Sequence, residues 1–258
     1  MTLIAALRCS DGLILGSDSQ ETRGARGHRL ARSTQKLYEP RPGFLLAWAG
    51  PQDVAQGFTL RLARARRLSP STDRLEIKAR LHEILVELRE DSSIEARSDH
   101  VELLIAWWSR SEGKHVGLHL FSGGAGEWVV TWAFGGMELG IESATFASGT
   151  LRYIDPTTLT LEQAKIVVLK VLRDAIDTTV EGIGGQIQLG TVQKGGVRVL
   201  DKADVRGLHD TVNLWESQCA ELLPGAAAPP LTGDTRDRGV SPPSRATRDR
   251  TEPTRYSA

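Results

Sequence analysis

Short apolar runs alternate with amphipathic stretches along this chain, and their order predicts its secondary structure. Two apolar runs flank Ser-Asp-Gly at 10–12, so residues 1–18 are predicted to form a β-hairpin that turns at Asp11-Gly12. The Gly- and Arg-rich stretch 23–32 has no apolar periodicity and is interpreted as a loop. Runs typical of further strands follow at 35–38, 44–49, 101–108, 116–121, 128–134, 143–149, 186–192 and 197–200.

Apolar residues at helical spacing predict helices in four other segments. The first runs from Gln52 to about Arg67, and the second has its apolar stripe between Ile77 and Leu88. The third opens at a Thr-x-x-Gln capping box, Thr160 to Gln163, and is apolar almost all round, which is typical of a helix buried between layers. The last carries a stripe that comprises Val205, Leu208, Val212, Trp215, Cys219 and Leu222.

This order of elements predicts an α+β fold. Strands that are apolar on both faces indicate sheets covered on both sides, as in a sandwich of two sheets with helices outside. After Pro224 the composition shifts to Ala, Pro, Arg, Asp, Ser and Thr, with almost nothing to bury. One domain over residues 2–223, followed by a disordered tail over 224–258, is therefore expected.

Composition and charge favour a soluble protein. The chain has 258 residues, is 40% hydrophobic, and balances 32 Lys and Arg against 32 Asp and Glu. That balance gives no electrostatic reason to expect nucleic acid or an anionic membrane as a partner. No apolar run reaches the roughly 20 residues that span a bilayer, and no signal peptide is recognisable. Cys9 and Cys219 lack metal or disulfide spacing, which suits a reducing compartment, so a cytoplasmic location is expected.

The second residue offers candidate chemistry. Removal of Met1 would leave Thr2 with both a hydroxyl nucleophile and a free α-amine, whose ordinary pKa is about 7.7–8.0. Asp18, at the end of the returning strand of the hairpin, would lie close to this new terminus. His115 and His119 could share a strand face, but no carboxylate or cysteine spacing supports a metal site, so neither a metal nor a cofactor is expected.

Several short motifs together resemble one known family. They are Thr2, Ser10-Asp11-Gly12, Gly16-Ser17-Asp18-Ser19 with Thr22 after it, Lys36, Ala49-Gly50-Pro51-Gln52-Asp53, Ala147-Ser148-Gly149 and Gly184-Gly185. In order and spacing they resemble the proteasome β-type subunits and their bacterial relatives, which are N-terminal nucleophile (Ntn) hydrolases. The resemblance covers residues 2–222 and implies a four-layer αββα sandwich of the Ntn-hydrolase type.

The resemblance also implies catalytic roles. Thr2 would be the nucleophile and its α-amine the base, while the charge of Lys36 would disfavour protonation of that amine. Asp18 matches the aspartate that pairs with the lysine. The backbone N–H of Gly50 would face the developing oxyanion, and Ser148 matches a serine near the N-terminal amine.

Three further residues fall where the family binds its substrate. Thr22 and Gln52 match positions at which backbone groups hold an extended peptide. Trp48 lies where the family lines its primary specificity pocket, which implies a shallow pocket. A polypeptide substrate and a homo-oligomeric assembly are therefore expected, and the resemblance allows an ATPase partner without specifying one.

The chain departs from the family next to Gly184-Gly185. The family has an Asp and a Ser there that orient the threonine amine, whereas this chain has Val180 and Ile183. Asp177 would substitute if the loop is longer. The leading hypothesis is a threonine-type endopeptidase in a homo-oligomer. Two alternatives stay open: a catalytically inactive assembly subunit of the same fold, and an amidase that acts on a non-peptide substrate.

Overall fold

The computed structural model describes residues 3–23, 30–66, 68–90, 101–123, 127–132, 137–139, 155–178 and 183–222. The chain divides into two units, Met1–Glu216 and Ser217–Ala258. Of the second unit, the described residues are 217–222, which form the C-terminal end of the last helix. The elements and cores below belong to the first unit, in which the last helix begins.

One sheet is built around the N-terminal hairpin. Its order is β10-β1-β2-β11-β12, and every pairing in it is antiparallel. In the β1–β2 hairpin Ile4 pairs with Ser17 and Arg8 with Leu13, which confirms the predicted turn at Asp11-Gly12. The strands are β1 (Ile4–Arg8), β2 (Leu13–Ser17), β10 (Met137–Leu139), β11 (Gln188–Gln193) and β12 (Gly196–Val199).

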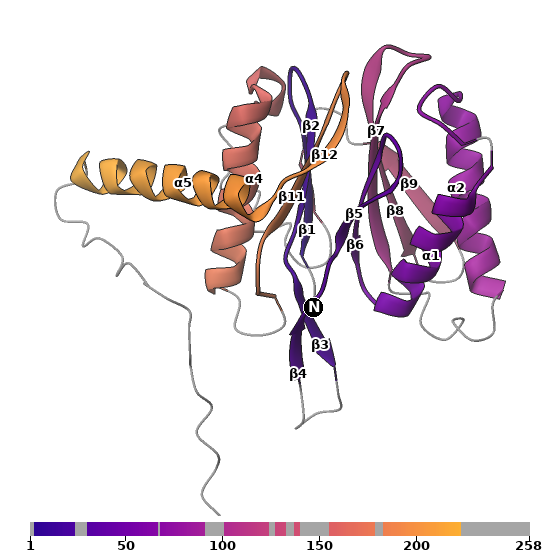
Figure 1. Cartoon of the computed structure of the whole chain (residues 1–258), viewed down its shortest axis with the longest axis horizontal. Helices are drawn as coiled ribbons and strands as arrows, with labels where there is room; N and C mark the ends of the chain where they lie inside the picture. Colours follow the sequence, from indigo (N-terminus) through magenta and orange to yellow (C-terminus); the bar gives the residue numbers. More distant parts are fainter. Residues whose placement is uncertain are drawn as a thin grey trace, which may run out of the picture. The chain divides into compact units, whose positions relative to one another are not determined.

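A second antiparallel sheet follows the order of its strands along the chain, β5-β6-β7-β8-β9. Its members are β5 (Leu37–Arg41), β6 (Phe44–Ala49), β7 (Glu102–Ser109), β8 (Lys114–Gly123) and β9 (Glu127–Trp132). Strands β3 (Gln20–Arg23) and β4 (Leu30–Ser33) form a separate two-stranded ladder. Figure 1 shows this ladder near the N-terminus of the chain.

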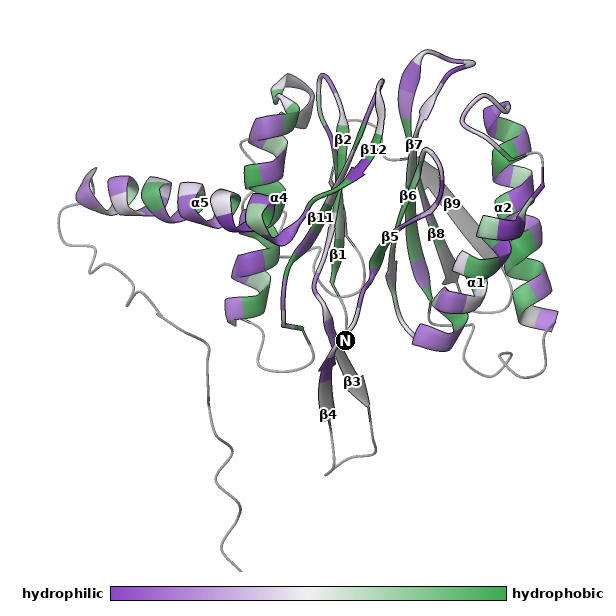
Figure 2. Ribbon diagram, viewed as in Figure 1, coloured by the Kyte–Doolittle hydropathy of each residue, from purple (hydrophilic) through white to green (hydrophobic). Residues whose placement is uncertain are grey.

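Helices pack on one face of each sheet, and the sheets pack on each other through their remaining faces (Figure 1). Strand β6 shows the alternation: Leu46 and Trp48 belong to the core shared with α1 and α2, whereas Leu45 and Ala47 belong to the core between the sheets. In Figure 2 stretches of green mark β1, β2 and β6, which contribute to these cores. The helices are α1 (Gln52–Arg64), α2 (Arg74–Glu90), the 3-10 helix η2 (Pro156–Thr158), α4 (Leu161–Thr178) and α5 (Lys202–Leu222).

The two antiparallel sheets with their helices confirm the predicted α+β class. The finer prediction, a four-layer αββα sandwich of the Ntn-hydrolase type, is not confirmed and is corrected to this coarser statement. None of the helices in the described ranges combines the length and the apolar character that a membrane crossing needs.

The N-terminus of α4 is capped from two directions. The predicted capping box is present, because the Thr160 N–H donates to Gln163 Oε1 at 2.9 Å and the Gln163 N–H donates to Thr160 Oγ1 at 3.4 Å. The Leu161 N–H donates to Asp11 Oδ1 at 2.6 Å. An added Cβ at Gly12 would lie 2.9 Å from a methyl carbon of Leu161. The Ser-Asp-Gly turn therefore also fixes the start of α4.

Three local predictions need correction or lie outside the described residues. The prediction of a loop over residues 23–32 is wrong at its described ends, because Arg23 closes β3 and residues 30–33 form β4. Trp215 does not belong to the buried stripe of α5, since its side chain is 52% exposed. The strand predicted at 143–149 lies outside the described residues.

Candidate functional site

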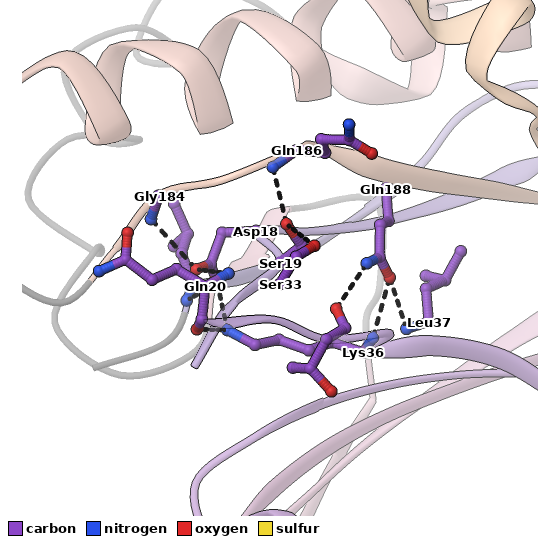
Figure 3. A network of polar contacts seen from close by, with 11 residues as sticks. Asp18, Ser19, Gln20, Ser33, Lys36, Leu37, Gly184, Gln186 and Gln188 are labelled. Carbon is purple, nitrogen blue, oxygen red and sulfur yellow. Dashed lines mark hydrogen bonds and ion pairs between the residues drawn. The ribbon is translucent and has the colours of Figure 1, made fainter. Parts of the chain in front are cut away.

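The carboxylate of Asp18 is the centre of a buried polar network at the end of β2 (Figure 3). Asp18 Oδ1 accepts from the Leu3 N–H at 2.9 Å and from Lys36 Nζ at 2.9 Å. Asp18 Oδ2 accepts from the N–H groups of Gln20 at 3.1 Å and of Gly184 at 3.2 Å. A carboxylate with four donors has its acceptor sites filled. These four donors therefore occupy the acceptor sites of Asp18, and its catalytic role stays a prediction.

Lys36 is held from its backbone and from its side chain. It is completely buried, and its Nζ also donates to the Gln20 carbonyl at 2.5 Å. The Lys36 N–H donates to Gln188 Oε1 at 2.9 Å, and its carbonyl accepts from the Trp48 N–H at 3.1 Å. Taking a cation and a carboxylate out of water costs several kcal/mol for each ion before their attraction is counted. Such a buried pair marks a candidate functional site.

Leu3 connects this pair to the chain's N-terminus. Its N–H donates to Asp18 Oδ1, and its carbonyl accepts from the Asp18 N–H at 3.1 Å. Leu3 is the residue that follows Thr2 in the sequence. The structure thus brings Leu3, Asp18 and Lys36 together, while Thr2 and Ser148 lie outside the described residues and their roles stay predictions.

The glycine pair after α4 is packed against the residues that follow Asp18. The Gly184 carbonyl accepts from the N–H groups of Ser19 at 3.2 Å and Gln20 at 2.9 Å. Gly185 has φ +76°, and an added Cβ would lie 2.5 Å from Ser19 Oγ. Ser19 Oγ in turn accepts from the Gln186 N–H at 2.7 Å. Only glycine fits position 185 without strain, because it needs both the left-handed backbone and the space that a side chain would take.

The side-chain amide of Gln188 holds the backbone around Lys36 in place, and the sequence analysis did not predict this role. Its Oε1 accepts from the N–H groups of Lys36 at 2.9 Å and Leu37 at 3.1 Å, and its Nε2 donates to the Thr34 carbonyl at 2.8 Å. Gln188 is the first residue of β11, so this one amide fixes the start of β5 against the other sheet. No local motif signals it, because its partners lie more than 150 positions away in the sequence.

The other predicted residues lie on the neighbouring elements. Gly50 follows β6 with φ +110°, a conformation that favours glycine. Gln52 begins α1, and its Nε2 lies 3.5 Å from Thr34 Oγ1. Trp48 is only 1% exposed in the core beneath α1. Thr22 is part of β3. Their roles in binding substrate and in the oxyanion contact stay predictions.

At the positions that depart from the family, no described side chain is recorded in a hydrogen bond to the network around Asp18. Ile183 is 9% exposed and packs in the apolar core beside α4. Asp177 is exposed, and its charge opposes the lowering of the pKa of His209 in α5. Val180 lies outside the described residues. No group of three or more His, Cys, Asp or Glu side chains in the described part of the chain could hold a metal ion.

No protein-family model and no curated protein matches this sequence. Solved structures do match its fold. Anbu (ancestral beta-subunit) from Yersinia bercovieri has a TM-score of 0.66 at 16% identity, covering 88% of this chain and 100% of that chain. An Anbu (Gly-1) mutant from Hyphomicrobium sp. strain MC1 has a TM-score of 0.65 at 14% identity, covering 86% and 96% of the two chains. Anbu from the same strain has a TM-score of 0.66 at 13% identity, covering 85% and 96%.

These matches correct the family assigned from the sequence motifs. The similar structures are Anbu proteins, which are proteasome-like, whereas the motifs had been interpreted as those of an Ntn-hydrolase proteasome β-type subunit. Short motifs led to this assignment because Thr, Lys, Asp and Gly at these spacings describe the end of a hairpin and its neighbours. They do not by themselves identify a family. At identities of 13–16% the matches show the fold alone.

Proposed function

We propose that this protein is a subunit of a proteasome-like assembly built from copies of the same chain. The observation that carries the proposal is the fold match, which extends over 100% of one Anbu chain at a TM-score of 0.66. The name of that structure describes it as an ancestral beta-subunit. A cytoplasmic location belongs to the same proposal and rests on the sequence features that favour a reducing compartment.

The test is the mass of the full chain in solution. Sedimentation velocity and native mass spectrometry over a wide concentration range should show a species larger than the 28.1 kDa chain. A protein that remains monomeric at every concentration would contradict the proposal.

A second candidate function, amide hydrolysis by Thr2, is favoured by the pair of Lys36 and Asp18. Lys36 Nζ lies 2.9 Å from the carboxylate that also binds the Leu3 N–H, one residue after Thr2. A fixed cation beside the terminus would hold the α-amine neutral, so that it could take the proton of the Thr2 hydroxyl during attack on a carbonyl carbon. The C–N bond of the amide would then break, and the protonated α-amine would give its proton to the leaving amine. Water would hydrolyse the resulting acyl-enzyme ester, releasing the acid and restoring the Thr2 hydroxyl, with a peptide or a non-peptide amide as substrate.

The mature mass separates this candidate from a catalytically inactive subunit. Retention of Met1 would block the α-amine and exclude the mechanism. If Met1 is removed, the wild type and Thr2→Ala are compared on a panel of peptide and small amide substrates. Hydrolysis by the wild type that is lost in Thr2→Ala supports the mechanism, and equal rates would eliminate it. Ser10→Ala serves as the control, because Ser10 is exposed and donates its hydroxyl to the Leu159 carbonyl.

A further inference from the structure

Helix α5 uses one face to dock on the rest of the first unit. Val205 and Val212 are buried on that face, in the core that includes α4. Farther along the same face, Glu216 forms an ion pair with Lys170 at 3.1 Å and another with Arg173. These contacts fix the orientation of the helix about its own axis, and therefore determine which residues point away from α4.

Two large apolar side chains lie off this docked face. Leu214 is 61% exposed and Trp215, its neighbour, is 52% exposed. An exposed apolar surface costs about 25 cal/mol per Å² relative to a buried one. Single exposed apolar residues are ordinary, whereas a contiguous apolar patch marks an interaction site.

Toward the N-terminus of α5, the side chains on this outer face become small. Ala203, Gly207 and Thr211 follow one another at four-residue spacing and lead to Leu214. An added Cβ at Gly207 would meet no atom within 4 Å. The Thr211 hydroxyl donates to the Gly207 carbonyl at 3.0 Å, so its hydrogen bond is made within the helix. One half of the face is therefore bulky, and the other half is small and free of unsatisfied hydroxyl groups.

Such a face is complementary to itself when two helices run antiparallel. A two-fold axis near residue 209 would place Trp215 and Leu214 of each copy over Ala203 of the other, with Gly207 facing Thr211 at the crossing. The charges agree with this register, since the exposed residues Arg206 and Asp210 lie one turn apart on the same flank. The two-fold axis brings Arg206 of each copy toward Asp210 of the other, which gives two symmetric ion pairs.

We propose that the outer face of α5 is an isologous interface at which a second copy of this chain docks antiparallel through the same helix. This inference rests on the proposed function, for which it names one of the contact surfaces. Burial of Leu214 and Trp215 supplies the apolar centre of the interface, and the pair of Arg206 and Asp210 sets its register and direction.

The experiment measures dimerisation of the full chain by sedimentation velocity as a function of concentration. In Leu214→Ser/Trp215→Ser the dimer dissociation constant should rise by about tenfold or more, which corresponds to about 1.4 kcal/mol. The matched control is Leu60→Ser/Leu75→Ser, because these leucines are 55% and 63% exposed on α1 and α2. It should dimerise as the wild type does.

A charge exchange tests the register independently of apolar burial. Arg206→Glu should weaken the dimer, because it places like charges against each other at both ends of the contact. The double variant Arg206→Glu/Asp210→Arg should restore the dimer, since the partners are only exchanged. Circular dichroism of each variant confirms that α5 is folded.

Each result supports or overturns a specific statement. A wild type that is monomeric throughout contradicts the assembly itself. A wild type that associates, with the α5 variants unchanged, overturns only the interface proposed here. Loss of the dimer on removal of residues 224–258 alone would assign the outer face of α5 to a contact with the tail, and would also overturn the proposal.

Discussion

Four nitrogen donors surround the carboxylate of Asp18 near the N-terminus. Three of the donors are backbone N–H groups, and only Lys36 carries a compensating charge. The pair costs desolvation free energy that an apolar pair would not. Its position beside Leu3 is the observation behind the candidate chemistry proposed for Thr2.

Lys36→Met tests the energetic part of this argument. The substitution keeps the length of the side chain but leaves a buried carboxylate without its cation, so the free energy of unfolding at neutral pH should fall by about 3–5 kcal/mol. Urea denaturation measures the change. Lys114→Met is the control, because Lys114 is 41% exposed and pairs with Glu112 at the surface, where such a pair is worth about 0–1 kcal/mol. Equal losses in the two variants would contradict the role given to burial.

Gly185→Ala tests the packing of the glycine pair against Ser19. The new Cβ would lie 2.5 Å from Ser19 Oγ at a backbone φ of +76°, and the strain should cost about 1–3 kcal/mol. Gly195→Ala is the matched control, since an added Cβ there meets nothing within 4 Å. Thermal unfolding of both variants is the measurement. A Gly185→Ala protein as stable as the control would show that the loop after α4 can move away from Ser19.

His115 gives the stability a dependence on pH. Burial, together with the charge of Arg8, lowers its pKa from the ordinary value of 6.5, although Asp11 acts in the opposite sense. The ring also packs edge-on against Trp108, with centroids 4.6 Å apart. Between the lowered pKa and 6.5 the unfolded chain binds more protons than the folded one, so the free energy of unfolding falls as the pH drops below about 6.5.

Denaturation curves between neutral and mildly acidic pH check this prediction. His115→Gln should reduce the slope of stability against pH. Part of the slope should remain, because burial and Arg173 also lower the pKa of His209. A slope that is identical in the wild type and His115→Gln would contradict the assignment.

At the scale of elements, helices and strands that local periodicity and turn residues encode were predicted from the sequence. Features that depend on contacts between distant segments were missed. The β1–β2 hairpin and the start of α4 follow from turn and cap residues. Strand β4 was missed because Leu30–Ser33 has no alternating pattern and, among the described strands, pairs with the equally polar β3. The spacing of Trp215 fits the predicted stripe, but α5 docks through the face that carries Val212 and Glu216, and Trp215 lies off that face.

The residues of the candidate site also fall into two kinds, those that a sequence motif predicted and those that only distant contacts identify. Asp18, Lys36 and Gly50 were chosen because they resemble a known motif, and the contact between Asp18 and Lys36 is present. Gln188 carries no such mark: glutamine in a strand is unremarkable until its amide meets Lys36, 152 residues away in the sequence. A single sequence records residue types and spacing, and it does not record which distant backbone groups need a partner.

The cap of α4 provides a test at this scale. Asp11→Ala removes the acceptor of the Leu161 N–H, and loss of such a cap costs about 0.5–2 kcal/mol. Asp11→Asn keeps a side-chain oxygen in the same place and should recover most of the stability. Urea denaturation of the two variants decides the question. Equal losses would mean that the charge of Asp11, and not its hydrogen bond, stabilises the helix.

At the scale of the whole molecule, we expect the cores of residues 3–216 to form without the tail, residues 224–258. Among the described residues, the three apolar cores take all their buried members from residues 3–212. Residues 224–258 contain few large apolar side chains, and an ordered segment costs about 1–2 kcal/mol per residue in backbone entropy. Deletion of 224–258 should therefore leave the midpoint of thermal unfolding unchanged. Deletion from residue 202 onward should lower it, because Val205 and Val212 leave the core beside α4. A lower midpoint on removal of the tail alone would contradict a domain that ends at residue 223, because the tail would then contribute to the fold.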